Sequence, residues 1–179
     1  QQQQQQGQQS WEQIDFSEIE LGEKIGGGGV GVIYEGRYRG QPVAVKTLFD
    51  PKVDDALMTE YMDELLVMSQ LEHENVVSFL GASMTPPNLF FVMELCDASL
   101  FNMLHEQHAA FTTYERVQIA CDVAAAMEYL HGMEPSCIIH RDLKSHNLLV
   151  SSRGIVKLCD FGLVKTRTTQ AGTPAYMAP

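Results

Sequence analysis

The chain has 179 residues, 45% of them hydrophobic, which is enough for one soluble domain with a core. With 12 basic and 23 acidic residues the net charge is −11, and we expect no nucleic-acid partner because phosphate binding needs a basic patch. Since no run of about 18 apolar residues occurs, we expect no membrane segment in this piece.

The first part of the chain predicts a linker followed by strands. Residues 1–10 are rich in glutamine and have no apolar face to bury, so we expect a disordered linker, with packing beginning at Trp11. From Ile19 to Leu48, alternating apolar residues and short turns predict three strands in an antiparallel meander.

The middle of the chain predicts one helix and two further strands. Residues 54–71 predict the helix. Its apolar side chains recur at helical spacing: Leu57, Tyr61, Leu65, Met68 and Leu71. The short apolar runs Val76–Leu80 and Leu89–Leu95 predict two strands joined by a turn.

Two helices are predicted after these strands. Ser99–His105 is a short helix, and a longer one begins at a capping box of Thr112 and Glu115. We expect its buried apolar face to consist of Val117, Ala120, Ala124, Met127 and Leu130. The order of elements indicates an α+β fold with a strand-rich first lobe and a helical second lobe, divided near Glu94–Asp97.

A glycine cluster interrupts the first predicted strands. Gly26, Gly28 and Gly31 form a G-x-G-x-x-G pattern, in which the missing side chains let backbone N–H groups approach phosphate oxygens. A strand rather than a helix follows and G-K-[ST] is absent, so neither a dinucleotide-binding turn nor a Walker A loop fits. Taken alone, the pattern fits a flexible hairpin about equally well.

Lys46 stands at the end of Val43-Ala44-Val45, in an otherwise apolar strand. A buried ammonium group is costly unless it is paired. The residue is therefore either a surface lysine on an edge strand or a phosphate clamp held by a carboxylate. Glu64 in the predicted helix is the candidate partner, with Asp63 and Glu60 as competitors.

A polar loop, H-R-D-L-K-S-H-N, runs from His140 to Asn147, and Asp160-Phe161-Gly162 follows a strand-like segment. Asp142 can accept the proton of an attacking hydroxyl, and Lys144 can neutralise charge on a transferred phosphoryl group. Asn147 and Asp160 offer the oxygen ligands that Mg²⁺ prefers. Each motif taken singly also fits turns and solvated polar residues, but the ordered set does not.

The ordered set resembles the eukaryotic protein kinase domain, over about Phe16 to Pro179. The resemblance implies a two-lobed α+β kinase fold, with a complete strand-rich N-lobe over 11–93 and a hinge over 94–97. It also implies a truncated helical C-lobe over 98–179, ending in the activation segment. Because the chain ends before the glutamate of an A-P-E sequence, we expect this piece alone to have low stability and little activity.

The resemblance implies ATP and Mg²⁺ as cofactors. In it, Lys46 contacts the nucleotide phosphates and pairs with Glu64, Asp142 is the catalytic base beside Lys144, and Asn147 and Asp160 bind Mg²⁺. The glycine loop, purine sandwich, gatekeeper and hinge supply the nucleotide-binding residues, which are Ile25, Gly26, Gly27, Gly28, Gly29, Val30, Gly31, Val32, Ile33, Ala44, Lys46, Met93, Glu94, Leu95, Cys96 and Leu149. The regulatory spine that it implies consists of Met68, Phe79, His140 and Phe161.

The segment Lys144-Ser145-His146-Asn147, together with Gly81-Ala82-Ser83 and the G-T-P-A-Y-M-A-P sequence of residues 172–179, resembles the tyrosine-kinase-like group, which contains Raf-type and mixed-lineage kinases. In that resemblance Lys144 is typical of serine/threonine kinases, and Thr173 would face the acceptor hydroxyl. The resemblance implies transfer of the γ-phosphoryl group of ATP to serine and threonine hydroxyls of proteins, in intracellular signalling. The alternatives are a pseudokinase and an inactive fragment that acts as a nucleotide-binding scaffold.

Regulation and location follow from the same resemblance. Thr166, Thr168 and Thr169 are candidate sites for an upstream kinase, where a phosphothreonine would pair with Arg141. The cysteines form no CxxC pair and no metal-ligand spacing, which favours reduced thiols. We expect a cytoplasmic domain, with membrane attachment through flanking sequence as an open alternative. Cys159 is either a small packed residue or a modifiable thiol beside the nucleotide.

Overall fold

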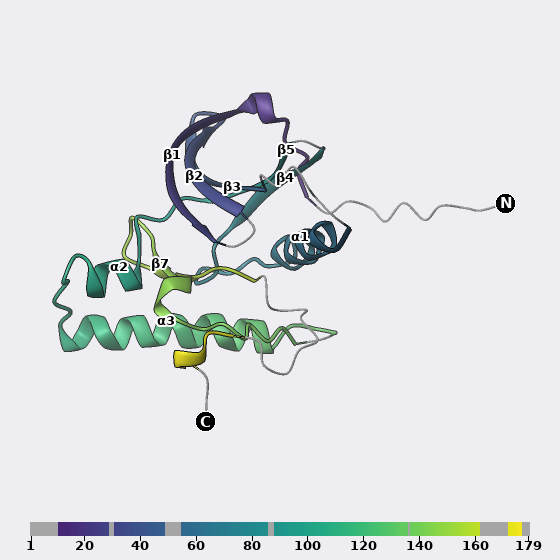
Figure 1. Ribbon diagram of the computed structural model, residues 1–179. Helices are drawn as coiled ribbons and strands as arrows, with labels where there is room; N and C mark the ends of the chain where they lie inside the picture. Colours follow the sequence, from purple (N-terminus) through teal and green to yellow (C-terminus); the bar gives the residue numbers. More distant parts are fainter. Residues whose placement is uncertain are drawn as a thin grey trace.

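The chain folds into a strand-rich part and a helical part, which Figure 1 shows one above the other in a computed structural model. The structure describes residues 11–28, 31–48, 55–85, 88–135, 137–161 and 172–176. Within them, no helix is both long and apolar enough to cross a membrane. The predicted α+β class with a strand-rich first lobe is confirmed.

The first part is a five-stranded sheet in the order β1-β2-β3-β5-β4, and every neighbouring pair is antiparallel. The strands are β1 (Ile19–Gly28), β2 (Gly31–Tyr38), β3 (Gln41–Leu48), β4 (Phe79–Thr85) and β5 (Asn88–Glu94). The predicted meander of β1 to β3 is confirmed. Because strand side chains alternate between faces, β3 and β5 bury apolar residues on both sides of the sheet.

The strand predicted over Val76–Leu80 is displaced, because β4 begins only at Phe79 and continues to Thr85. Val76 and Val77 are nearly fully buried, but Val76 makes only an isolated parallel bridge, to Leu158 in the other part of the molecule. The apolar run at 76–80 therefore reflects burial in a connection rather than membership of the sheet.

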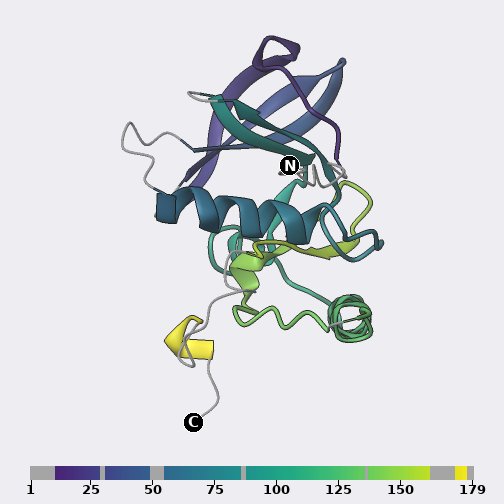
Figure 2. The same cartoon turned by 90° about the vertical axis from the view of Figure 1, so that its right-hand side faces the viewer.

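Helix α1 (Asp55–Met68) lies below the sheet, between it and the helical part, as Figure 2 shows. Tyr61, Leu65 and Met68 are buried on the predicted face. The helix ends at Met68, before the expected Leu71, which is nevertheless buried in the following turn.

The second part contains two helices, α2 (Leu100–His105) and α3 (Thr113–His131), and a small sheet. The small sheet has the order β6-β7-β8, formed by β6 (Ala98–Ser99), β7 (Leu148–Val150) and β8 (Val156–Leu158). Short 3-10 turns η1 (Phe16–Glu18), η2 (Ser145–Asn147) and η3 (Pro174–Tyr176) complete the described elements.

The start of α3 agrees with the sequence, whereas its buried face does not. Thr112 and Glu115 form the predicted capping box. The side chain of Val117 is 57% exposed, and Ala120 and Ala124 are exposed too, so the predicted face was wrong there. The helix instead packs through Ile119, Val123, Ala126, Met127 and Leu130. Apolar residues on more than one side of α3 left its orientation ambiguous in sequence.

The segment before β1 packs on the sheet, as expected from Trp11, whose side chain lies against the main core. Ile14 is fully buried, and its N–H donates to the carbonyl of Ala82 at 3.0 Å. The N–H of Ala82 in turn donates to the carbonyl of Glu12 at 3.0 Å. Residues 12–14 therefore cover the outer edge of β4.

Candidate active site

Lys46 on β3 and Glu64 on α1 form a close ion pair. The Lys46 Nζ lies 2.6 Å from Glu64 Oε1 and 2.8 Å from Oε2. Glu64 points at the sheet because it stands three residues after Tyr61 and four before Met68, on the helix face that packs inward. The pair uses two of the three ammonium donors, so the third can meet an anion such as phosphate.

Lys46 also lies 5.1 Å from the centre of the Phe91 ring, where a cation–π contact adds to its fixation. The side chain of Glu64 is only 9% exposed, so loss of the lysine would leave a carboxylate buried without its charge partner. The structure thus brings together the two residues that the sequence predicted to pair.

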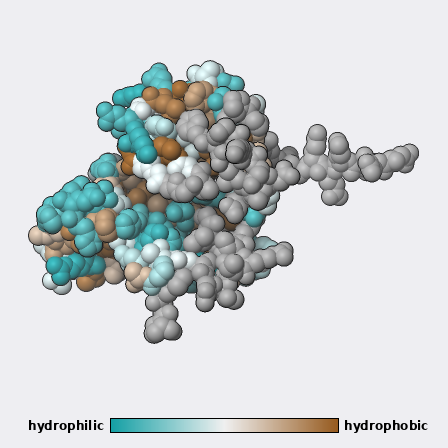
Figure 3. Space-filling model, viewed as in Figure 1, coloured by the Kyte–Doolittle hydropathy of each residue, from teal (hydrophilic) through white to brown (hydrophobic). Residues whose placement is uncertain are grey.

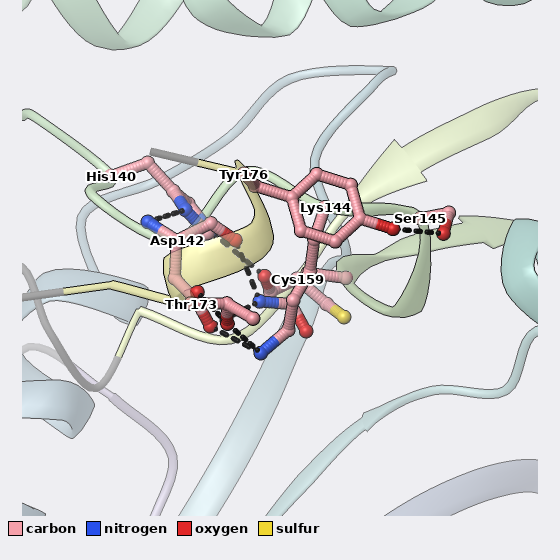
Figure 4. Close-up of polar contacts among 8 residues, drawn as sticks. His140, Asp142, Lys144, Ser145, Cys159, Thr173 and Tyr176 are labelled. Carbon is pink, nitrogen blue, oxygen red and sulfur yellow. Dashed lines mark hydrogen bonds and ion pairs between the residues drawn. The ribbon is translucent and has the colours of Figure 1, made fainter. Parts of the chain in front are cut away.

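Asp142 is the centre of a hydrogen-bond network in the loop between α3 and η2 (Figure 4). The Lys144 Nζ lies 2.6 Å from Asp142 Oδ2, and the Thr173 hydroxyl donates to Asp142 Oδ1 at 2.6 Å. Lys144 also donates to Thr173 Oγ1 at 2.9 Å. The Asn147 amide donates to the Asp142 carbonyl at 2.9 Å and to Oδ2 at 3.1 Å.

These contacts keep Asp142 ionised. Burial alone would raise the pKa of this carboxyl, but the hydrogen bonds from Lys144, Thr173 and Asn147 and the charge of Lys144 outweigh it and lower the pKa. An ionised carboxylate that already accepts a bond from a hydroxyl, as Oδ1 does from Thr173, has the geometry needed to take a hydroxyl proton.

His140 supports this loop from inside the core. It is fully buried, its Nε2 lies 3.0 Å from the Cys159 carbonyl, and its ring packs edge-to-face on Phe161 at 5.2 Å. The Asp142 N–H donates to His140 Nδ1, so the proton of the neutral ring is assigned to Nε2. Burial lowers the pKa of His140, although the bond to Cys159 opposes that shift.

Asn147 and Asp160, the predicted metal ligands, come from adjacent segments. The Cys159 N–H donates to the Asn147 carbonyl at 3.0 Å, which ties the end of β8 to the polar loop. Asp160 is exposed and adopts a left-handed backbone conformation with φ of 66°. A non-glycine residue in this region carries strain, which is typical of functional sites.

Asn147 and Asp160 offer two oxygen ligands, which suits Mg²⁺ better than a metal whose ligands all come from the protein. The side-chain nitrogen of Asn147 donates to Asp142, which leaves the side-chain oxygen of Asn147 for a cation. Asp160 contributes a carboxylate. Among the described residues, no group of three or more His, Cys, Asp or Glu could hold a metal ion. Mg²⁺ commonly takes one or two protein ligands and completes its shell with phosphate oxygens and water.

The predicted nucleotide-binding residues come from the large sheet, from the connection that follows β5 and from β7. Figure 3 shows apolar residues at the surface where the strand-rich and helical parts meet. Ala44 and Met93 belong to the main core, and Ile33, Leu149 and Cys96 pack against it. Ile25 on β1 is 49% exposed. Of the glycine loop, Gly26, Gly27, Gly28, Gly31 and Val32 lie on the paired ends of β1 and β2. Gly29 and Val30 lie outside the described residues.

Gly31 is fixed as glycine by a close approach of backbone. A Cβ at this position would lie 2.9 Å from the Thr47 carbonyl oxygen and 3.8 Å from the Cε and Cγ atoms of Lys46. The start of β2 can therefore lie this close to the β3 backbone beside Lys46 only while this side chain is absent.

The sequence did not predict a second lysine pair. Lys157 on β8 is 5% exposed, and its Nζ lies 2.8 Å from Glu94 Oε1 at the end of β5. The same carboxylate oxygen accepts the Ser78 N–H at 2.6 Å. Lys157 lies between the apolar residues Val156 and Leu158, the same signal that singled out Lys46. The Glu94 side chain is thus engaged by protein atoms.

The remaining predicted site features are placed as follows. Met68 and Phe161 are buried in the main core, Phe79 packs against it, and His140 contacts Phe161, so the four spine residues share one region. Burial raises the pKa of the Cys159 thiol, and it raises that of Cys96 to about 11, so neither is a reactive thiolate at neutral pH. Thr166, Thr168 and Thr169 lie outside the described residues.

Comparison with known proteins agrees with this geometry. The family described as protein kinase domain matches residues 19–179. The chain is 40% identical to serine/threonine-protein kinase CTR1 of Arabidopsis thaliana over 176 residues, which cover 93% of this chain and 21% of that protein. It is 37% identical to serine/threonine-protein kinase STY46 of the same plant over 176 residues, covering 94% of this chain and 30% of that protein.

A similar relative comes from Dictyostelium discoideum. A probable serine/threonine-protein kinase, drkC, is 40% identical over 177 residues, which cover 93% of this chain and 24% of that protein. The chain spans between 13% and 31% of the length of such curated relatives. The family match over nearly all of the sequence, together with the two lobes and their ordered motifs, shows that the chain belongs to the protein kinase domain family.

Proposed function

We propose that the chain is the ATP-handling part of a serine/threonine protein kinase of the tyrosine-kinase-like group, which transfers the γ-phosphoryl group of ATP to a protein hydroxyl. The observation that supports this most is the Asp142 carboxylate, held by Lys144 and Asn147, with a hydroxyl 2.6 Å from Oδ1. The relatives' names support serine and threonine as acceptors.

Each residue has a role in this proposal. Lys46, held by Glu64, binds phosphate oxygens, and Asn147 and Asp160 hold Mg²⁺. When bound, ATP supplies the phosphoryl group and Mg²⁺ neutralises charge on its oxygens. Asp142 orients the acceptor hydroxyl and takes its proton, and Lys144 stabilises the negative charge that develops beside it.

We further propose the lobe boundaries and nucleotide contacts that the sequence suggests. Residues 11–93 would form the N-lobe, 94–97 the hinge and 98–179 the C-lobe portion. Residues 1–10, for which the sequence predicts a linker, lie outside the described residues. In support, β5 ends at Glu94 and β6 begins at Ala98. The apolar residues around Ala44 and Met93 would enclose the purine, and the glycine loop would cover the phosphates.

Substitution of the base tests the proposal. The full-length protein is incubated with Mg²⁺, labelled ATP and peptides that differ only in a serine, threonine or tyrosine acceptor. We expect label on serine and threonine peptides, and we expect Asp142→Asn to lower kcat by about a hundredfold or more while the nucleotide affinity stays near that of the unaltered chain. Glu128→Gln, an exposed carboxylate on α3, is the control and should change neither.

Two results would contradict the proposal. Transfer that is equal in Asp142→Asn and the unaltered chain would remove Asp142 from catalysis. Nucleotide binding without any transfer would favour the pseudokinase alternative, against which the intact set of Lys46, Glu64, Asp142, Asn147 and Asp160 argues.

Regulation and location are further parts of the proposal. We propose that an upstream kinase phosphorylates Thr166, Thr168 or Thr169 and that the domain acts in the cytoplasm, which the four free cysteines support. Replacing the three threonines with alanine should abolish activation by phosphorylation. Equal activation of the substituted chain would show that the modification acts elsewhere.

A further inference from the structure

Strand β8 leads directly to Asp160, and one of its edges is completed from the other part of the molecule. β7 covers one edge of β8. On the other edge, the Leu158 N–H donates to the Asn75 carbonyl at 2.9 Å, and the Val77 N–H donates to the Leu158 carbonyl at 3.0 Å. Alternate residues of a strand direct their backbone groups to the same edge, so Val156 faces this side too.

The backbone groups of Leu158 bond to the backbone of residues 75–77, whereas those of Val156 bond to two side chains. The Val156 N–H donates to Asp122 Oδ2 at 2.9 Å, and the Val156 carbonyl accepts from Asn75 Nδ2 at 3.0 Å. Asp122 comes from α3, and Asn75 comes from the connection between α1 and β4. One side chain from each part of the molecule thus holds the first residue of β8.

Loss of the contacts to Val156 would cost folding free energy. Val156 is 2% exposed, so its N–H would be shielded from water without Asp122, and an unpaired buried donor is strongly disfavoured. The strand would then move to satisfy that donor. The displacement would pass along the extended backbone to Cys159, which contacts both Asn147 and His140, and so to Asp160.

We propose that Asp122 is a positioning residue for the metal-binding end of β8. Its carboxylate fixes Val156, and through the strand it fixes where Asp160 stands relative to Asn147. The inference rests on the proposed ATP- and Mg²⁺-dependent function. It assigns a role in that function to a side chain on the inner side of α3, remote from the reacting groups.

The chain offers a matched control on the same helix. Asp122 Oδ1 accepts from Gln118 Nε2 at 3.0 Å, a contact between exposed groups that does not reach β8. Gln118→Ala therefore removes a partner of Asp122 without removing the acceptor of the Val156 N–H. Asp122→Asn keeps a carbonyl oxygen in the same place and should rescue the contact.

Two measurements on the full-length protein test the proposal. The first is amide hydrogen exchange of residues 156–160. The second is the Mg²⁺ concentration for half-maximal binding of a fluorescent ATP analogue, compared with binding of the analogue without metal. Asp122→Ala should raise the required Mg²⁺ concentration roughly tenfold and speed exchange, while metal-free binding stays unchanged. Asp122→Asn and Gln118→Ala should resemble the unaltered chain.

Failure of this inference can be distinguished from failure of the proposed function. An unchanged Mg²⁺ requirement in Asp122→Ala would overturn the inference, as would an equal loss of metal-free and metal-dependent binding, which a merely structural role produces. If Asp122→Ala does not fold, Asp122→Glu, which displaces the carboxylate, should raise the Mg²⁺ requirement by a smaller factor, and no increase would overturn it. Absence of any Mg²⁺-dependent binding in the unaltered chain would refute the proposed function and this inference with it.

Discussion

Among single residues, the two lysines that form ion pairs between elements, Lys46 and Lys157, differ in how far the sequence around them predicts their partners. Glu64 could be predicted for Lys46 because helical spacing from Tyr61 and Met68 places it on the buried face of one helix. Glu94 could not be predicted for Lys157, since it lies at the end of a strand in the other lobe and belongs to no periodic pattern. An ion-pair partner that only the tertiary structure brings close, such as Glu94, cannot be recognised from the local sequence.

His140 gives the fold a specific dependence on pH. The unfolded chain protonates this ring near its ordinary pKa of about 6.5, whereas burial lowers the pKa in the folded protein. The unfolded state therefore gains a proton first, and stability falls as the pH drops below that value. We expect the melting temperature to fall more between pH 7.5 and 5.5 in the unaltered chain than in His140→Phe. An equal fall in both would contradict this assignment.

At the scale of elements, strand order and helix capping follow from local sequence, whereas orientation and extent do not. The meander of β1 to β3 and the Thr112–Glu115 capping box depend on neighbours in the chain. The displaced start of β4 and the rotated face of α3 depend on what packs against them, which apolar periodicity does not specify.

Gly81 on β4 tests how the segment before β1 is attached. A Cβ at this position would lie 2.6 Å from the Glu12 carbonyl oxygen and 2.7 Å from Ile14 Cδ1. We expect Gly81→Ala to destabilise the chain by about 1–3 kcal/mol, because the overpacked segment must shift. That corresponds to a fall of roughly 3–10 °C in melting temperature, measured by calorimetry.

Removal of the segment provides the control for Gly81. In a chain that lacks residues 1–16, the atoms that the new methyl group would meet are gone. Gly81→Ala should then cost little, and a penalty of the same size in both backgrounds would show that the clash lies elsewhere.

For the whole molecule, the motif order predicted two lobes and a hinge, but not the further contacts between the lobes. In the structure, residues 75–77 pair with Leu158, and the Lys157–Glu94 ion pair adds a second contact. A motif defines its own loop, whereas contacts between lobes arise only when both are folded. The positions of Asp142, Asn147 and Asp160 depend on both kinds of structure.

The Lys157–Glu94 pair should measurably couple the lobes. Lys157 is nearly fully buried, whereas the Glu94 side chain is 27% exposed, so the pair is only partly shielded from solvent. We expect Lys157→Met and Glu94→Gln each to destabilise the chain, and the double variant to lose about 1 kcal/mol less than the sum. Urea unfolding of the four proteins gives this coupling, and strict additivity would show that the pair contributes nothing.

Residues 12–14, which cover the edge of β4, affect the choice of the N-terminal boundary for expression. The family match begins at residue 19, so a boundary placed there would discard Glu12 and Ile14 and uncover a sheet edge. Open edges recruit strands from other molecules and promote aggregation. Expression clones should therefore begin at or before Trp11. Light scattering of clones starting at residues 11 and 19 should show that only the shorter protein self-associates.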